Sequence, residues 1–185
     1  MTEVVSLAEV SETSVFGSKA VGLGEAVRDG LPVPPGVALS GPVVEAVAAG
    51  DEQAIAIVTE AVRPLGGPLA VRSSAVDEDG ADASFAGQQD TYLWIRGIDD
   101  VLHHMRRCIS SLYTGRAIAY RANRAFAHGE VAISVGVQKM ARSYTAGVMF
   151  TLHPANGDRS VIVIDSNFGF GESVVSGEVT PDHFV

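Results

Sequence analysis

Two strand-like runs joined by a long acidic loop limit the possible folds of this chain more than any other feature. The runs span 69–71 (LAV) and 92–95 (YLWI), and the loop closes on 85–89 (FAGQQ). Apolar runs bounded by polar turn residues predict strands on either side of the loop. Arg72 follows the first run directly, so a cation at a strand end faces a glycine loop with accessible backbone N–H groups. This combination suits the binding of a polyphosphate.

A second cation beside a glycine lies upstream, in Gly17-Ser18-Lys19. Lys19 and Lys139 are the only lysines among the 13 Lys and Arg residues. An ordinary surface lysine and a phosphate contact are both compatible with this spacing. Arg72 has a similar alternative, a weak surface ion pair with the acidic residues of 77–82. The two elements together make nucleotide binding the leading hypothesis.

The remaining pattern predicts helices and strands that alternate irregularly along one α+β chain. Gly22 and Gly24 each weaken the first helix by about 1 kcal/mol relative to Ala, which indicates a close neighbour there. The strand at 160–167 is the most apolar and is predicted to be the most buried. Predicted helices span 19–29 (ended by Gly30), 42–49, 51–63 (with Asp51 as N-cap) and 99–127; predicted strands span 37–39, 69–71, 92–95, 131–140, 146–152 and 160–167.

Composition and charge exclude several classes of protein. The chain has 185 residues, 46% of them apolar, and a formal net charge of −9, which argues against a nucleic-acid binder. Its single cysteine, Cys108, allows neither an intrachain disulfide nor a cysteine metal cluster. None of the five histidines makes a convincing metal or catalytic site. We expect no membrane span, no signal peptide and no metal held by these side chains, in a soluble cytoplasmic protein.

Several blocks, taken in order, resemble the N-terminal ATP-binding domain of the phosphoenolpyruvate synthase and pyruvate phosphate dikinase family. The same domain occurs in rifampicin phosphotransferases. The blocks cover nearly the whole chain, and AVRSSA followed by ASFAGQQDTYL is far more specific than a lone glycine motif. They are Gly17-Ser18-Lys19 through GLGEAVRDGLPVPPGVALS, AVRSSAVDEDGADASFAGQQDTYL, SLYTGRAIAYR, VGVQKM, AGVMFTLHP and VIVIDSNFGFGESVVSGEVTPD.

The resemblance implies an α+β, ATP-grasp-like fold with a mixed sheet and flanking helices. It implies that Lys19 and Arg72 are catalytic and contact the ATP phosphates, and that the loop 87–89 lies over the phosphates. The strand end at 138–140 would lie beside adenine, and Glu172 would reach the ribose or the metal shell. The implied ATP-site residues are Lys19, Arg72, Gly87, Gln88, Gln89, Gln138, Lys139, Met140, Thr151 and Glu172.

The resemblance also implies a reaction. Family members use ATP and Mg²⁺, release AMP and inorganic phosphate, and pass the β-phosphoryl group to a histidine on a separate domain. That histidine then phosphorylates pyruvate, or rifampicin in the other branch of the family.

The second half of the family's ATP domain and its phosphohistidine domain have no counterpart in these 185 residues. We therefore expect a partial ATP-binding domain, with subdomains at about 1–95 and 96–185, that belongs to a longer enzyme or needs a partner subunit. Alone it would be inactive. A rifampicin phosphotransferase and a non-catalytic nucleotide-binding module remain open as alternatives. Among the site residues, Met140 could instead belong to the core, and Glu172 could simply favour a helix N-terminus.

Overall fold

The computed structural model describes residues 3–75, 79–80, 83–84, 91–115, 118 and 133–185. The chain forms two compact units, 1–140 and 141–185. This boundary differs from the expected division near residue 95. The strand at 133–139 lies inside the sheet of the first unit, so the chain up to Met140 belongs with that sheet.

The first unit is built on a five-stranded sheet in the order β1-β2-β7-β3-β6. Every strand pair in the described part of the chain is antiparallel, so the expected mixed sheet is wrong. β2 and β3 do run in the same direction, but β7 lies between them and pairs antiparallel with both. The strands are β1 (Val4–Ser6), β2 (Gly36–Leu39), β3 (Leu69–Ala75), β6 (Thr91–Ile95) and β7 (Ile133–Lys139), with a separate two-stranded pair, β4 (Asp79–Gly80) and β5 (Ala83–Ser84).

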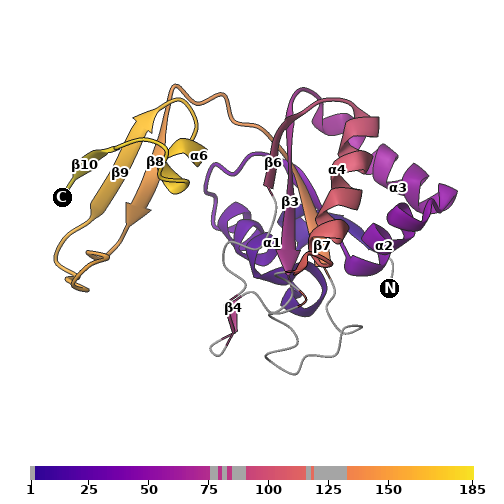
Figure 1. The fold of residues 1–185 in the computed structure, drawn as a ribbon, viewed down its shortest axis with the longest axis horizontal. Helices are drawn as coiled ribbons and strands as arrows, with labels where there is room; N and C mark the ends of the chain where they lie inside the picture. The colour runs from indigo at the N-terminus through magenta and orange to yellow at the C-terminus, as the bar shows by residue number, and fades with distance from the viewer. Residues whose placement is uncertain (1–2, 76–78, 81–82, 85–90, 116–117, 119–132) are drawn as a thin grey trace. The chain divides into compact units, whose positions relative to one another are not determined.

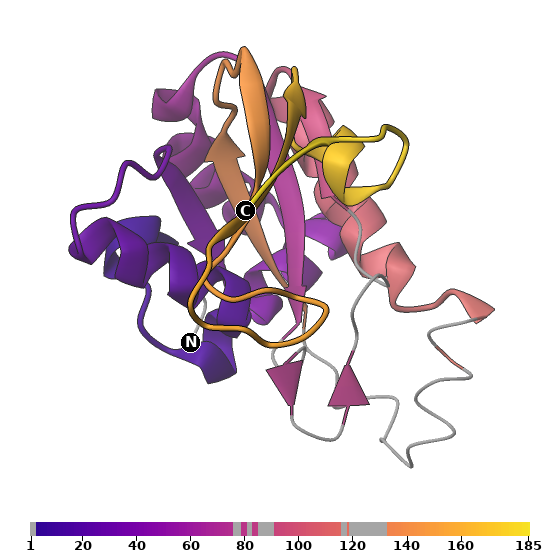
Figure 2. The ribbon, with the colours of Figure 1, turned by 90° about the vertical axis from the view of Figure 1, so that its left-hand side faces the viewer.

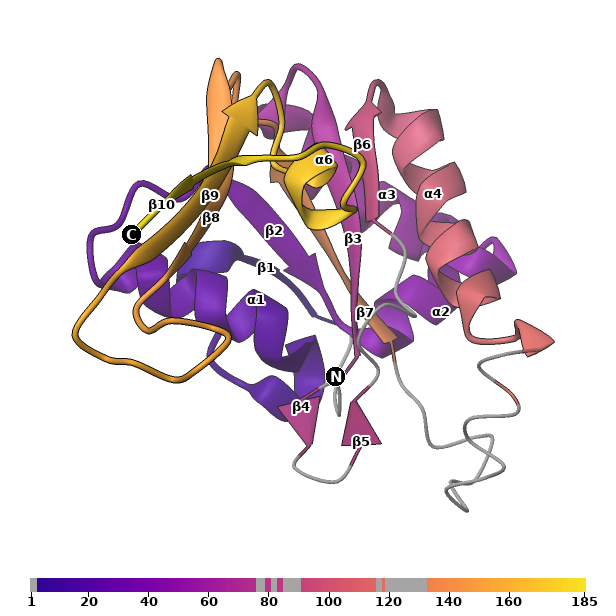
Figure 3. The same ribbon diagram turned by 60° about the vertical axis from the view of Figure 1, so that its left-hand side comes forward.

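Helices cover both faces of this sheet (Figures 1 and 3). One core cluster joins α2, α3 and α4 to Val71, Val135 and Val137 of the sheet. A smaller cluster on the other face joins the short 3-10 helix η1 and α1 to Ala38. No helix in the described ranges is long and apolar enough to cross a membrane. The helices are η1 (Leu7–Glu9), α1 (Thr13–Arg28), α2 (Gly41–Ala49), α3 (Glu52–Val62), η2 (Arg63–Leu65) and α4 (Ile98–Ser111).

Local sequence signals explain where these helices begin and end. The predicted N-cap of α3 is confirmed, because the side chain of Asp51 accepts a hydrogen bond of 2.8 Å from the N–H of Ala54. α1 ends at Arg28, and Gly30 adopts a positive φ of 80° just beyond it, as the sequence predicts. In α4, Val101, Met105 and Cys108 are fully buried at helical spacing, so that helix packs one apolar stripe onto the sheet.

A break at Gly17 divides α1 into two helical pieces. Gly17 has φ 76° and ψ 162°, which is not helical, so the helix starts again at Ser18. Glycine adopts this conformation without the steric penalty that a Cβ would bring. Lys19 therefore lies in the first turn of a helical piece rather than in the middle of a long helix.

Only one of the two weak points predicted in α1 has a close neighbour. A Cβ at Gly24 would lie 2.7 Å from the carbonyl oxygen of Leu7 and 2.8 Å from that of Val10. A Cβ at Gly22 would meet nothing within 4 Å. Gly24 thus lets the 7–10 segment lie directly on α1, and Gly22 has no such function.

The second unit contains a three-stranded sheet in the order β10-β9-β8, with the short helix α6 packed against β8 and β9. Figure 2 shows the long irregular connection between β8 and β9 as an orange loop. The expectation that 160–167 is the most buried strand is wrong: Val163 is buried, but Ile162 is 54% and Ile164 is 37% exposed. β7, covered on both faces, is far more buried. The elements are β8 (Thr145–Phe150), β9 (Val163–Phe168), α6 (Glu172–Val175) and β10 (Asp182–Phe184).

One face of this small sheet carries large apolar side chains that the unit does not cover. Met149, Ile164 and Phe184 are direct cross-strand neighbours and therefore share that face. Met149 is 62% and Phe184 is 55% exposed. On the opposite face, a Cβ at Gly171 would lie 3.7 Å from the side chain of Ala146, where the turn before α6 packs.

Candidate functional site

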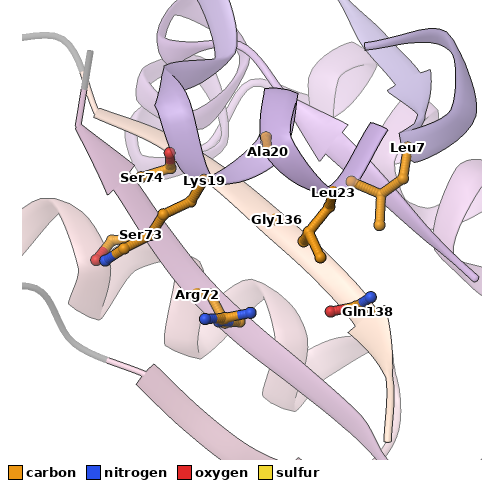
Figure 4. A pocket seen from close by; sticks show the side chains of 9 residues that line it. All are labelled: Leu7, Lys19, Ala20, Leu23, Arg72, Ser73, Ser74, Gly136 and Gln138. Carbon is orange, nitrogen blue, oxygen red and sulfur yellow. The ribbon is translucent and has the colours of Figure 1, made fainter. Parts of the chain in front are cut away.

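The first unit contains a pocket between α1 and the strands β3 and β7 (Figure 4). Lys19 extends from α1 toward β3, and Arg72 comes from β3 itself. The two cations that the sequence singled out, from segments more than fifty positions apart, therefore line one pocket. The full lining is Leu7, Lys19, Ala20, Leu23, Arg72, Ser73, Ser74, Gly136 and Gln138.

The register of β3 and β7 explains why a polar floor forms under α1. Ser74 pairs with Ser134 and Arg72 with Gly136, and direct cross-strand partners share a face. The residues in between, such as Val71 and its partner Val137, point to the opposite face and join the α2–α4 core. Apart from Ser73, the face toward α2–α4 is thus apolar, and the face toward α1 carries Arg72, Ser74 and Ser134.

Gly136 keeps the pocket floor open. It pairs with Arg72, and a Cβ placed on it would have only the carbonyl oxygen of Arg72 nearby, at 4.0 Å. No tight backbone contact requires a glycine at this position. The missing side chain leaves space directly beside the guanidinium-bearing residue.

The break at Gly17 supplies the other wall. Because the helix starts again at Ser18, the N–H groups of its first turn lie at a helix N-terminus, where they and the helix dipole favour anions. Lys19 is exposed and Ala20 is buried against the cluster beneath α1. The arrangement combines a cation and a helix start on one side with a second cation on the other.

Ser134 connects the two walls. Its hydroxyl lies 2.5 Å from the carbonyl oxygen of Phe16 and 2.8 Å from that of Ser74, with all these contacts buried. The single hydrogen of this hydroxyl is shared between the two carbonyl oxygens, one on the residue that precedes the break at Gly17 and the other on β3. Sequence reasoning missed Ser134. The signal was present in the predicted strand 131–140, where Ser134 lies between the apolar Ile133 and Val135.

The strand end at 138–140 is held by the proline segments beside it. Gln138 lines the pocket, and its side-chain amide donates to the carbonyl oxygen of Pro34 at 2.9 Å. The N–H of Lys139 donates to Pro35 at 2.9 Å, and the N–H of Met140 donates to Pro68 at 3.0 Å. These two N–H groups are engaged, so an adenine edge at this strand would need other groups.

The geometry of this pocket does not test the remaining predicted site residues. Gly87, Gln88 and Gln89 lie outside the described residues, as do the acidic side chains of 77–82 that could pair with Arg72. Thr151, just after β8, and Glu172, the first residue of α6, belong to the second unit. Within the described ranges, no group of three or more His, Cys, Asp or Glu side chains could hold a metal ion.

Comparison with known proteins identifies a matching family and several similar sequences. The family described as "Pyruvate phosphate dikinase, AMP/ATP-binding domain" matches residues 44–185. A probable phosphoenolpyruvate synthase of Staphylothermus marinus is 38% identical over 98% of this chain and 28% of its own length. The phosphoenolpyruvate synthase of Helicobacter pylori is 49% identical over 71% of the chain and 16% of its own length. A probable phosphoenolpyruvate synthase of Archaeoglobus fulgidus is 54% identical over 63% of the chain and 15% of its own length. The chain thus spans less than a third of each of these relatives.

Proposed function

The chain belongs to the pyruvate phosphate dikinase AMP/ATP-binding domain family, and on this basis we propose that the pocket beneath α1 binds the phosphates of ATP. The observation that carries the proposal is that Lys19 and Arg72 line the same pocket. Two cations and a helix start in one site match a polyphosphate better than a neutral ligand. An ATP-grasp-like domain would then hold the nucleotide between this unit and other segments.

The two cations have different tasks in this proposal. Arg72 offers a planar fork of N–H donors that can bind two phosphate oxygens at once, while Lys19 supplies a compact charge. Both would orient the triphosphate and offset the negative charge that develops as a phosphoryl group moves. The open floor at Gly136 gives a phosphate room to approach Arg72.

The other predicted ligand residues complete the proposed site. The loop 87–89 would cover the phosphates, and Gln138 with the neighbouring strand end would lie near the base. Thr151 and Glu172 of the second unit would contribute to the ribose or to the Mg²⁺ shell. Mg²⁺, when bound, would neutralise phosphate charge.

We further propose that the chain acts as the ATP-binding part of a phosphoenolpyruvate synthase-like dikinase. ATP would be split into AMP and inorganic phosphate, with the β-phosphoryl group passed to a histidine on another domain and then to pyruvate. The names of the curated relatives favour pyruvate over rifampicin as the acceptor. The histidine domain and the rest of the ATP domain would be the necessary partners.

Binding of ATP to this chain and its variants tests the phosphate proposal. Lys19→Ala and Arg72→Ala should each weaken ATP binding at least tenfold, or about 1.4 kcal/mol, in titration calorimetry or NMR titration. Arg106→Ala is the matched control, because Arg106 is exposed on α4 and does not line this pocket. Wild-type affinity in both pocket variants would overturn the assignment.

In an enzyme that contains this chain, the same two substitutions should abolish AMP formation from ATP. Far-UV circular dichroism should stay unchanged, because neither side chain is part of a core cluster. AMP release measured with pyruvate and with rifampicin would identify the acceptor.

A further inference from the structure

Ser74 carries a buried hydroxyl group for which the described residues supply no hydrogen-bond partner. The residue is 3% exposed, and its Oγ makes no hydrogen bond. Among the described residues, the hydroxyl of Ser18 is the one other buried side-chain polar atom in this situation. Buried polar groups in folded proteins are nearly always paired, so each exception calls for an explanation.

Other buried polar side chains of the first unit do have partners. The hydroxyl of Ser40 accepts a hydrogen bond of 3.1 Å from the N–H of Glu3. The hydroxyl of Ser134 shares its hydrogen between two carbonyl oxygens, and the side-chain amide of Gln138 donates to the carbonyl oxygen of Pro34. The unpaired hydroxyl of Ser74 is therefore not a general property of polar residues in this core.

The position of Ser74 indicates what could pair with it. Ser74 lies two residues after Arg72 on β3, so both side chains are on the face toward α1, and both line the pocket (Figure 4). Its own carbonyl oxygen is already bonded by Ser134, which fixes the residue. The backbone of Ser74 is thus restrained where its side chain lines a site that carries two cations. Ser18 does not line the pocket, and nothing in the structure explains its hydroxyl.

We propose that the hydroxyl of Ser74 donates a hydrogen bond to a phosphate oxygen of the ligand bound between Lys19 and Arg72. A hydroxyl donates well to an anionic oxygen, and such bonds are short and strong. The group stays unpaired in the free protein because its partner arrives with the ligand. This inference rests on the proposed function and adds a neutral donor to its two cations.

Two measurements on Ser74→Ala test the inference. Removal of an unpaired buried hydroxyl should leave the melting temperature of the ligand-free chain unchanged or raised. The same change should weaken binding of inorganic tripolyphosphate at least fivefold in titration calorimetry. A purely structural serine would give the opposite result, a lower melting temperature and unchanged binding, and this outcome would overturn the inference.

Three further variants make the test specific. Ser74→Cys keeps the size of the side chain with a much poorer donor, so it should lose binding as Ser74→Ala does. Ser40→Ala should lower the melting temperature, because it leaves the N–H of Glu3 without its acceptor, and should not change binding. Arg72→Ala separates the two proposals: if it loses tripolyphosphate while both Ser74 variants bind normally, this inference fails and the proposed function stands. If the wild-type chain does not bind tripolyphosphate, both fail.

Discussion

Replacing Gly24 by alanine should destabilise the first unit, although alanine is the better helix former. A Cβ at this position would lie 2.7 Å and 2.8 Å from two backbone oxygens, well inside ordinary contact. Those oxygens belong to Leu7 and Val10, at the two ends of the segment that lies on α1. The segment cannot shift freely, because Arg28 donates to the carbonyl oxygens of Ala8, at 3.1 Å, and Val10, at 2.7 Å.

The size of the effect follows from two opposing terms. Alanine gains about 1 kcal/mol over glycine in a helix interior. Forcing an extra methyl group into a packed site costs about 1–3 kcal/mol. Gly22→Ala, two residues earlier in the same helix, gains the helix propensity of alanine without the packing cost, because a Cβ at Gly22 meets nothing within 4 Å. We expect Gly22→Ala to be up to about 1 kcal/mol more stable than wild type, and Gly24→Ala to be about 1–3 kcal/mol less stable than Gly22→Ala.

Urea unfolding of wild type and both variants, followed by circular dichroism, measures these differences. The comparison removes helix propensity from the result, since both changes are Gly to Ala in one helix. Leu7 lines the proposed phosphate pocket, so Gly24→Ala should also weaken ATP binding while Gly22→Ala should not. Equal stability of the two variants would show that the 7–10 segment does not lie on Gly24 as described.

Three other changes test separate parts of the molecule. Gly136→Ala should leave stability within about 0.5 kcal/mol of wild type but weaken ATP binding at least fivefold, because the methyl group enters the open pocket floor; unchanged affinity would contradict this. Met105→Ala should cost about 2–5 kcal/mol in urea unfolding, since Met105 is fully buried, whereas exposed Arg106→Ala should stay within about 0.5 kcal/mol. Hydrogen bonds from the backbone N–H and then the hydroxyl of Ser160 lower the pKa of Asp158, so its stabilising contribution is present above the ordinary carboxyl pKa and is lost as the pH falls through the lowered value. In an NMR titration, Ser160→Ala should raise the pKa of Asp158 only part of the way toward the ordinary carboxyl value. The hydrogen bond from the backbone N–H of residue 160, which lowers the pKa more, remains in this variant.

Local features of the fold were predictable from the sequence, and long-range features were not. The cap at Asp51 and the helix end before Gly30 depend on neighbouring residues only. The insertion of β7 between β2 and β3 depends on contacts across the chain, which no local pattern contains. The exposure of β9 shows the same limit, because apolar composition does not tell how much of a sheet another layer covers.

The candidate site divides in the same way. Cations beside glycines marked Lys19 and Arg72 in the sequence, and the structure brings them to one pocket. The positions of Ser74 at the pocket and of Ser134 beneath it were missed, because they depend on which face of a strand each residue occupies and on the register of β3 against β7. Serines are common in loops and strands alike, so residue type alone could not single them out.

The central place of β7 has a consequence for the order in which the chain assembles during synthesis. β2 and β3 leave the ribosome early, but both pair with β7, which begins only at Ile133. The hydroxyl of Ser134 on β7 bonds to the carbonyl oxygen of Phe16, 118 positions earlier in the chain. Contacts between residues so far apart in sequence slow folding. A nascent chain that ends before Ile133 lacks β7, so the pocket is incomplete and a ligand of that pocket could not yet stabilise the fold.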